Sequence, residues 1–357
     1  MPLKQPASIQ IADKIISTTT HPFRSKCGEL LPFLRTEFPR QLHDFEKRFY
    51  KKEYRVDLQL LQKRRSLMSQ VCAALTHQEL KAVPCGSIAS GLMTSNSDLD
   101  AVVIPFDEKR FFDRYEKDLN FKRKQLARCH RKLLNSNLVR GSFTEFIPWA
   151  RVPIVRMVLK TGDHLDVQFH DARILKSTNF IRVANNLDHR LFMLRIHLFK
   201  TLTENGLLAS QEGRFSSFHV TSLLIHFLQV PFFDCAVYPP LLSTFPDLQP
   251  GINWKTIAYD VATNRLYQGA ESFEKSMDSL GALYVRLIDY FSGINFHEDA
   301  LDISNGSVVK KDTISDQVEL RDAYFPETST CRVQSGASLL SNFFATQRER
   351  IEAGKLT

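Results

Sequence analysis

The chain has 357 residues, 43% of them hydrophobic and 24% charged, which is typical of a soluble globular protein with two or three domains. Its six cysteines include no CxxC pair and no zinc-like spacing with histidine, so a disulfide framework and a zinc module are excluded. The first 20 residues lack a long apolar core and a small-residue cleavage pattern, and no window approaches 18 uninterrupted apolar residues, so we expect neither secretion nor a membrane span. We therefore expect an intracellular protein, cytoplasmic or nuclear, that does not contact a membrane.

The net charge of +8 is spread unevenly along the chain. Between Lys109 and Lys160 there are 14 Lys and Arg residues against 4 Asp and Glu residues. Such a local excess favours a polyanionic partner such as nucleic acid. A solvated basic helix face is the alternative explanation.

The first half of the chain is expected to combine helices and strands. Residues 34–80 carry apolar side chains at helical spacing and predict one or two helices. The runs "KAVPCGS" and "LDAVVI" predict two strands, the second of them closed by Pro105. Residues 107–137 predict a basic helical excursion. The runs "TEFIPWARVPIVRMVLK" and "HLDVQFH" then predict a β-hairpin around a glycine-containing turn.

After Phe180 the chain is expected to be helical. The four predicted helices, the first with Gly206 as its C-cap, are "LDHRLFMLRIHLFKTLTENG", "SSFHVTSLLIHFLQ", "SFEKSMDSLGALYVRLIDYFSG" and "GASLLSNFFATQRERIEAG". The predicted fold class is therefore α+β. An α/β domain over 70–172 would be embedded in a mostly helical domain drawn from 1–69 and 173–357.

Two acidic residues, Asp98 and Asp100, flank one leucine at the start of the predicted strand "LDAVVI". Residues two apart in a strand point to the same face, so the two carboxylates would lie side by side and repel each other. A divalent cation between them would remove that cost, and magnesium binds carboxylate oxygens together with substrate phosphate. The alternative explanation is a solvated strand end.

The turn at Gly86 and Ser87 could complete such a site. Glycine lets backbone N–H groups approach a phosphate closely, and a serine hydroxyl adds a donor, as Ser97 also could. Asp166, on the strand "HLDVQF", could bring a third carboxylate and act as general base for a ribose hydroxyl. Three aspartates holding two ions form the arrangement used for in-line phosphoryl transfer. Separately, a Gly-Ser pair is an ordinary turn, and Asp163 is predicted to be only a turn residue.

Together these motifs resemble the DNA polymerase beta-like nucleotidyltransferase superfamily, and within it the noncanonical poly(A) polymerases and terminal uridylyltransferases. The run "GSIASGLMTSNSDLD" is similar to the family signature GS-x-x-x-G-x-x-x-x-x-SD-x-D, with Gly91 also in place. "ARVPIVRM" and "LDVQF" resemble the two strands that lead into and carry the third aspartate. "LDHR", "SSFHVTSLLIHFLQ" and "LRDAYFPETSTCR" resemble segments of the helical central domain. The resemblance extends from Leu80 to Arg332.

The resemblance implies a palm-like catalytic domain with a mixed sheet, a helical central domain, and a nucleotide cleft between them. It also implies template-independent addition of ATP or UTP to an RNA 3′ end, with Mg²⁺ or Mn²⁺ held by Asp98, Asp100 and Asp166. Further implied contacts are Gly86, Ser87, Ser97 and Lys200 with the triphosphate, Thr178 with the ribose, Ser217 and Phe218 with the base, and Arg151 and Arg156 with the RNA backbone.

Several positions depart from the family pattern. Ser177 replaces an asparagine, Phe218 replaces a tyrosine, and Lys200 lies one position from the expected phosphate-binding lysine. Thr328 stands where uridylyltransferases have a histidine that reads the uracil edge. Loss of a polar side chain that hydrogen-bonds to the base changes which nucleotide is selected rather than the phosphoryl transfer itself. We therefore expect ATP to be favoured over UTP as substrate, with mixed incorporation of the two nucleotides.

Two alternatives differ in class. A catalytically inactive relative would bind RNA or a protein as a scaffold. A related nucleotidyltransferase would make short oligonucleotides or transfer a nucleotide to a small molecule. Because no separate RNA-binding module is visible, RNA would be selected either by the basic surface between Lys109 and Lys160 or by an RNA-binding partner protein.

Overall fold

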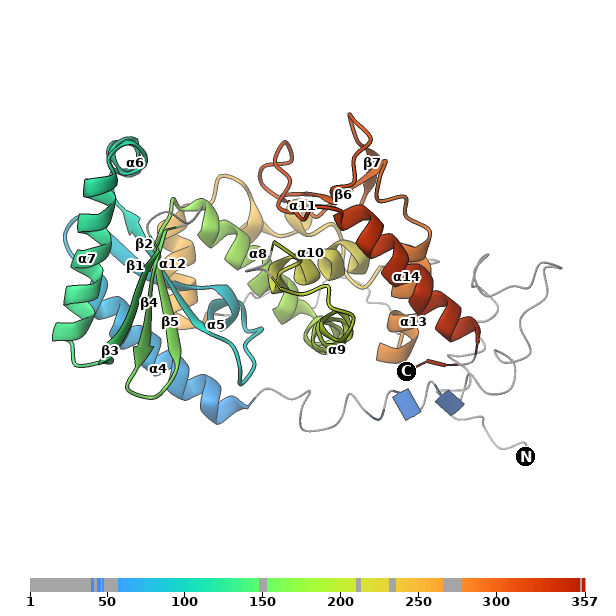
Figure 1. Ribbon diagram of the computed structural model, residues 1–357, viewed down its shortest axis with the longest axis horizontal. Coiled ribbons are helices and arrows are strands. Elements are labelled where there is room, and N and C mark those ends of the chain that lie inside the picture. Colours follow the sequence, from blue (N-terminus) through green and yellow to red (C-terminus); the bar gives the residue numbers. More distant parts are fainter. Residues whose placement is uncertain are drawn as a thin grey trace. The chain divides into compact units, whose positions relative to one another are not determined.

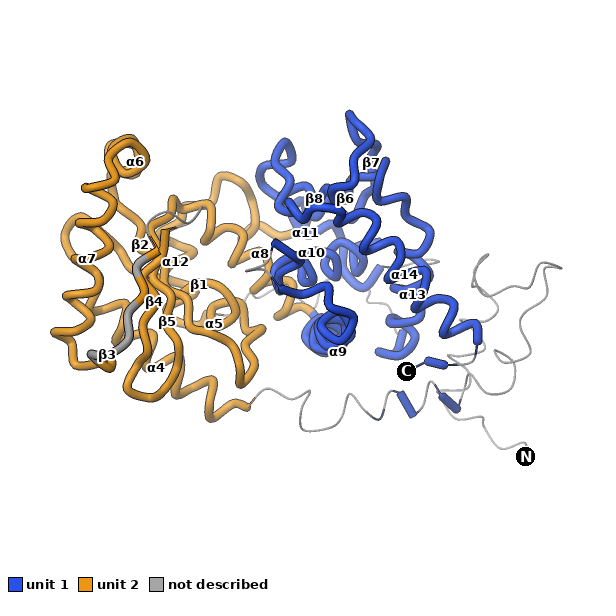
Figure 2. The backbone as a smooth tube through the Cα atoms, viewed as in Figure 1, with its two compact units in different colours: residues 1–55, 188–244, 272–357 blue, residues 56–187, 245–271 orange. Residues whose placement is uncertain are grey.

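The computed structural model describes residues 40–41, 44–45, 47, 57–147, 153–209, 213–230, 236–265, 278–353 and 355–356. It divides the chain into two compact units (Figures 1 and 2). The sheet unit comprises residues 56–187 and 245–271, and the helical unit comprises residues 1–55, 188–244 and 272–357. Among the described residues, no helix is long and apolar enough to cross a membrane.

The sheet unit is built on a mixed five-stranded sheet with the strand order β1-β2-β5-β4-β3. Its strands are β1 (Leu80–Cys85), β2 (Leu99–Pro105), β3 (Val139–Ile147), β4 (Ile154–Leu159) and β5 (His164–Phe169). Strand β2 is antiparallel to β1 and parallel to β5, while β4 and β5 form the predicted antiparallel hairpin. The sheet thus confirms the α+β class and places the predicted aspartate strands, β2 and β5, next to each other.

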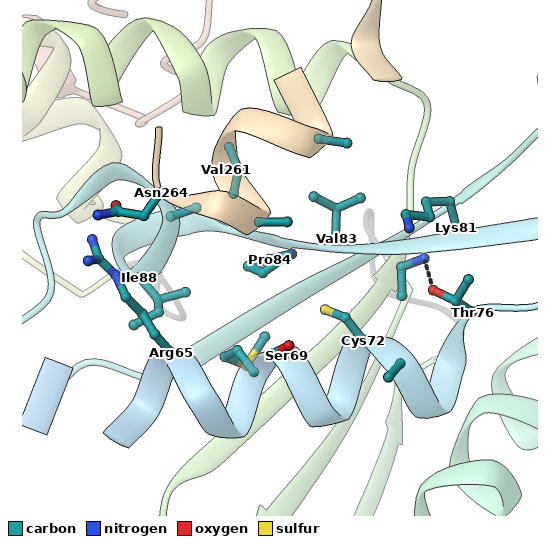
Figure 3. A pocket seen from close by; sticks show the side chains of 16 residues that line it. Arg65, Ser69, Cys72, Thr76, Lys81, Val83, Pro84, Ile88, Val261 and Asn264 are labelled. Carbon is teal, nitrogen blue, oxygen red and sulfur yellow. Dashed lines mark hydrogen bonds between the residues drawn. The ribbon is translucent and has the colours of Figure 1, made fainter. Parts of the chain in front are cut away.

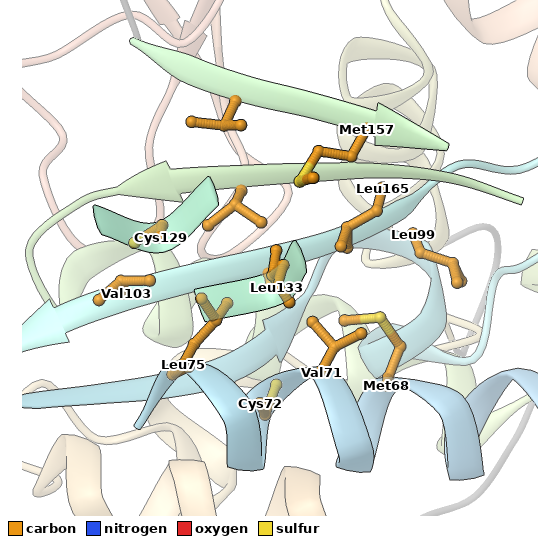
Figure 4. Close-up of a cluster of buried hydrophobic side chains, with 14 of the residues drawn as sticks. Met68, Val71, Cys72, Leu75, Leu99, Val103, Cys129, Leu133, Met157 and Leu165 are labelled. Carbon is orange, nitrogen blue, oxygen red and sulfur yellow. The ribbon is translucent and has the colours of Figure 1, made fainter. Parts of the chain in front are cut away.

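Helices cover both faces of this sheet. One face packs against α4 (Leu58–Leu75), α6 (Glu108–Lys117) and α7 (Leu119–Asn135), and Figure 4 shows this larger core. The other face packs against α8 (Arg173–Leu187) and α12 (Trp254–Thr263), while the short α5 (Gly86–Ser90) contacts α8 and places its Ile88 in the larger core. The carboxylates of Asp57, Asp107 and Asp118 accept backbone N–H bonds at the starts of α4, α6 and α7, so each helix begins at an N-cap aspartate.

The alternation of β2 decides which face carries the acidic group. Leu99 and Val103 are fully buried in the core beneath α4 and α7, whereas Val102 packs on the opposite face with α8 and α12. Because side chains alternate along a strand, Asp100 lies on the same face as Val102. This confirms that the apolar neighbours of Asp100 point away from it.

Within its described residues, the helical unit contains four long helices and a small sheet. The helices are α9 (Arg190–Glu204), α10 (Ser217–Leu228), α13 (Leu280–Ser292) and α14 (Gly336–Glu352), with the short α11 (Leu241–Thr244) beside them. The sheet, ordered β7-β6-β8, consists of β6 (Asp299–Asp302), β7 (Val308–Lys310) and β8 (Glu319–Arg321). Stacked rings of Phe291, Phe296 and Phe344 join α13 to α14 in its core.

Three features differ from the sequence prediction. Helix α8 begins at Arg173 rather than after Phe180, and it belongs to the sheet unit although 173–357 was predicted as part of the helical domain. The small sheet of the helical unit was not predicted, because its strands are three or four residues long and show no extended alternation. The predicted 70–172 domain lies within the sheet unit, which also includes α4, α8, α12 and the 3₁₀ turn η4 (Pro246–Leu248).

The buried guanidinium of Arg64, on α4, ties together the two loops that enter the aspartate strands. It donates to the carbonyl oxygens of Thr94, Ser95 and Ser97 at 3.0, 2.9 and 3.2 Å, in the loop before Asp98. Its Nε also donates to the Asp163 carboxylate at 2.8 Å, in the turn that precedes β5. Asp163 is therefore more than a turn residue: through Arg64 it links the β4–β5 turn to the loop before β2.

Replacing Arg64 with alanine is expected to lower the free energy of unfolding by about 3–5 kcal/mol, the usual cost of removing one partner of a buried ion pair. Urea denaturation followed by circular dichroism measures this loss. Lys63→Ala, at an exposed position of the same helix, is the matched control and should change stability by less than about 0.5 kcal/mol. Equal stability of the two variants would show that Arg64 does not organise these loops.

Candidate active site

The turn at Gly86 lies directly against the carboxylate of Asp100. Gly86 has a φ of +61°, which favours glycine, and a Cβ built on it would lie 2.4 Å from the Asp100 Oδ2 atom. Residue 85 pairs with Asp100 across β1 and β2, so the strand register itself places the turn beside this side chain. The Gly-Ser turn and the aspartate strand predicted from the sequence therefore meet in one place.

Helix α5 is fixed in position by a second glycine. Gly91 ends α5 with a φ of +78°, and a Cβ there would lie 2.9 Å from the amide nitrogen of Asn185 on α8. That Asn185 amide donates to the Ser90 carbonyl at 3.2 Å. The close contact between α5 and α8 thus accounts for the glycine at position 91 of the motif.

The hydroxyl of Ser87 points to no other described group. Ser87 is half-buried, its carbonyl accepts from Leu92 at 3.0 Å, and its side chain makes no hydrogen bond within the described part of the chain. Ser97 differs, because its hydroxyl accepts the Thr94 N–H at 2.9 Å and closes the loop that Arg64 holds. Ser87 is therefore free to donate to a phosphate, whereas Ser97 shapes the loop before Asp98.

The carboxylate of Asp100 sits in an unfavourable electrostatic environment. Burial, followed by the negative charges of Asp166 and Asp98, raises the pKa of Asp100 from 3.8 to about 7. Asp98 lies just before β2 and is exposed, while Asp166 is the register partner of Asp100 on β5. The structure thus gathers three acidic groups within electrostatic range of one another.

Asp166 is held by an arginine on the neighbouring strand. Arg156 faces Asp166 across β4 and β5 and donates to its two carboxylate oxygens at 2.8 and 2.7 Å. This bidentate pair raises the pKa of Arg156 well above its usual range. Arg156, predicted to contact RNA, therefore contacts the third aspartate in this structure.

The acidic cluster fits a divalent cation in part. Asp98 and Asp100 offer oxygen ligands of the kind that magnesium prefers, and the pKa of Asp100 is raised by burial and then by neighbouring negative charge, which a cation would offset. Both oxygens of Asp166, however, are bound to Arg156. Within the described residues, no three His, Cys, Asp or Glu side chains are arranged to hold a metal ion. The donor set fits a metal bound by Asp98 and Asp100, with Asp166 available only after Arg156 moves.

The remaining predicted contacts lie on other elements. Thr178, on α8 of the sheet unit, is only 6% exposed, so it offers a ribose little surface. Lys200 and Ser217 are exposed on α9 and α10 of the helical unit, and Phe218 there is half-buried. Arg151 lies outside the described residues. The roles of these residues stay predictions.

Two features of the site were not found from the sequence. Arg64 stands in an ordinary basic run on α4, and nothing local distinguishes it from its neighbours. The partner of Arg156 could have been found from the hairpin, because a turn at residues 160–163 places position 156 opposite 166. The missed signal was therefore strand register, which follows from the turn that had been identified.

Residues 40–184 match the family model described as "Poly(A) RNA polymerase, mitochondrial-like, central palm domain". This segment contains Gly86, Asp98, Asp100 and Asp166. No sequence among curated proteins gives a match.

Solved structures with similar folds include a cytoplasmic RNA terminal U-transferase, with 16% identity, a TM-score of 0.67, and coverage of 87% of this chain and 93% of that one. They also include the Cid1 poly(U) polymerase, with 16% identity and a TM-score of 0.64, covering 88% of this chain and 93% of that one. At these identities the structures show that the fold is shared over both units. The palm-domain match therefore agrees with the resemblance found in the sequence over residues 40–184, and the solved structures show that this chain shares the fold of RNA terminal nucleotidyltransferases.

Proposed function

We propose that this protein adds ribonucleotides to RNA 3′ ends without a template, in a reaction that depends on magnesium or manganese. The observation that carries the proposal is the contact between Gly86 and the Asp100 carboxylate. It places a phosphate-binding type of turn directly beside an acidic group that repels two others. A nucleotide triphosphate with its divalent cation satisfies both features at once.

Different residues of the sheet unit would bind the triphosphate and the metal. The backbone at Gly86 and the hydroxyl of Ser87 would bind the triphosphate, and Asp98 and Asp100 would hold the metal. When bound, that metal supplies charge neutralisation for the transferring phosphoryl group. Arg64 has no contact with either ligand in this scheme; it holds the loop that carries Asp98 in place.

Asp166 and Arg156 would exchange partners when substrate arrives. RNA phosphates are alternative acceptors for the Arg156 guanidinium, which accounts for the predicted RNA contact of this residue. Released from Arg156, the Asp166 carboxylate would become the third metal ligand and would accept the proton of the terminal ribose hydroxyl.

Nucleotide choice is proposed to favour ATP. In the helical unit Phe218 presents a ring for base stacking, which is worth about 1–3 kcal/mol for any base. Thr328, in the position expected for a uracil-reading histidine, is exposed in the segment that follows β8. Cid1 is described as having a mechanism for UTP selectivity, and it has been solved with Mg and 3′-dATP bound.

RNA would be held by the basic helices α6 and α7 or with the help of a partner protein. Exposed Arg and Lys side chains along both helices supply sequence-independent phosphate contacts, so binding would weaken as salt rises. The neighbouring Cid1 structures include a complex with the short product ApU and one with a UTP analogue.

A catalytically inactive scaffold is the second candidate function. The observation in its favour is the bidentate pair of Arg156 with Asp166, which already satisfies the third carboxylate without a metal. The two functions differ in whether nucleotide and RNA are converted.

Asp98→Ala and Asp100→Ala are each expected to lower RNA extension by about a thousandfold, because several kcal/mol of charge stabilisation is lost. Purified protein, magnesium, a labelled oligoribonucleotide and each NTP in turn measure this, with ATP expected to give the longest products. Asp113→Ala, at an exposed position on α6, is the control and should extend normally. Equal extension by all variants would indicate a contaminant, and no extension by the wild type with any NTP would favour the scaffold.

Gly86→Ala is expected to weaken NTP binding and extension at least tenfold, because the new Cβ would displace the Asp100 carboxylate. Gly162→Ala is the control for backbone strain. Gly162 also has a positive φ, but a Cβ there would meet nothing within 4 Å, so this variant introduces strain without a contact to Asp100. Both variants should lose about 1 kcal/mol of stability. Equal NTP affinity in the two variants, measured by calorimetry, would contradict the proposed role of the Gly86 turn.

Asp100→Asn is expected to stabilise the metal-free protein, and to do so more at pH 8 than at pH 5. Because the pKa of Asp100 is raised from 3.8 to about 7, the folded protein holds this proton more tightly than the unfolded chain. The wild-type free energy of unfolding therefore falls as the pH rises through that window, by up to about 4 kcal/mol, and asparagine removes the loss.

Urea denaturation in EDTA at both pH values checks this prediction. Added magnesium should then stabilise the wild type at pH 8 and have a smaller effect on the Asn variant. A variant less stable than the wild type at pH 8 would show that the charged Asp100 carboxylate is not destabilised by its burial and its acidic neighbours.

A further inference from the structure

A groove on the sheet unit lies behind the Gly86 turn and plays no part in the proposed reaction. Helices α4 and α12 form its walls, β1 forms its floor, and α5 borders it (Figure 3). Its volume is about 370 Å³, within the range of roughly 300–1,000 Å³ typical of small-molecule sites. Most of the lining is apolar and small, including Ala73, Ala82, Val83, Ala258 and Ala262.

The polar groups of the groove are cationic or neutral. Figure 3 shows Arg65 and Asn264 at one end and Lys81 at the opposite end. Arg65 is half-buried, burial lowers its pKa, and no carboxylate pairs with it in the described part of the chain. Among the described residues, no Asp or Glu lines the groove. A half-buried guanidinium above an apolar floor is suited to an anionic group attached to an apolar body.

Two other kinds of occupant are disfavoured by the chemistry of the floor. An added β-strand would need free N–H groups along the edge of β1, but the Ala82 N–H donates to the Thr76 hydroxyl at 3.1 Å and Pro84 has none. Covalent attachment is also disfavoured, because burial raises the pKa of the Cys72 thiol to about 12. A reversibly bound small molecule remains.

We propose that this groove binds a small amphipathic anion, with its apolar body against β1 and its carboxylate, sulfonate or phosphate on Arg65. Two wall residues, Ile88 and Ala89, belong to α5, the short helix that begins at Gly86. A ligand in the groove therefore contacts the element that carries the catalytic turn and alters NTP affinity. This regulatory part rests on the proposed function, whereas ligand binding itself does not.

The probe is 8-anilinonaphthalene-1-sulfonate, which has an apolar ring body and one sulfonate, titrated calorimetrically into the full-length protein without nucleotide. We expect saturable binding of one probe per chain. Ala262→Trp, which fills the groove from an exposed position, should weaken binding at least tenfold. Thr263→Trp, at the next exposed residue of α12 but outside the groove, should leave binding unchanged.

The anion contact is tested separately. Arg65→Gln should weaken probe binding about tenfold, and Lys63→Gln, exposed on the same helix, should not. The neutral analogue N-phenyl-1-naphthylamine should bind the wild type about tenfold more weakly than the sulfonate does. Equal affinity of the two probes, or of the Trp pair, would overturn the proposal.

Two further measurements complete the test: the oligomeric state of Ala262→Trp and the ATP affinity in the presence of the probe. If the probe does not bind and Ala262→Trp changes the oligomeric state on size-exclusion chromatography, the groove is an interface between copies, and the proposal is wrong. If the probe binds as expected, ATP affinity measured with and without saturating probe should differ at least threefold. Unchanged ATP affinity would contradict the proposed effect of the groove on NTP binding, but not the binding of the anion itself. Absence of any ATP binding would instead count against the proposed function.

Discussion

The buried guanidinium of Arg64 is the interaction on which the candidate site depends. The two aspartate strands, β2 and β5, are entered through loops that have no regular structure, and Arg64 binds both of them from outside the sheet. A buried charge is costly unless its hydrogen bonds are satisfied, and here three carbonyls and one carboxylate satisfy it. The position of Asp98 relative to Asp166 is therefore set by a helix that carries no catalytic residue.

Strand alternation and the two glycine positions were predictable because each depends on residues close together in the sequence. The buried strand "LDAVVI", the hairpin around Gly162 and the turn at Gly86 all follow from local patterns, and the structure has each of them. Arg64 was not predictable, because its acidic partner lies 99 residues away and its own neighbours are equally basic. The small sheet of the helical unit has strands too short to alternate visibly, and the limits of the sheet unit depend on long-range packing of α8 and α12 that no local pattern encodes.

Charge balance explains why Arg156 and Asp166 are paired in the absence of ligand. Burial first, and then the charges of Asp166 and Asp98, raise the pKa of Asp100, and the Arg156 guanidinium offsets part of that charge repulsion. The single positive charge of Arg156 offsets the charge of three carboxylates less completely than a divalent ion would. Arg156 belongs to the chain, however, so this pairing needs no metal ion from solution. The same arginine that stabilises the acidic cluster in the free protein thus determines which of its members can receive a metal.

The turn at Gly86 is packed tightly on one side and loosely on the other. Toward the sheet it leaves no room for even a Cβ beside Asp100, whereas the helix that continues from it borders the groove along β1. Helix α5 is held by the Asp100 contact at its start and by Asn185 of α8 at its end, and Ile88 and Ala89 between them line the groove. Packing that fills this groove would hold the turn against Asp100, and this link between a remote surface and the carboxylate follows from the register of β1 with β2, which places residue 85 opposite Asp100.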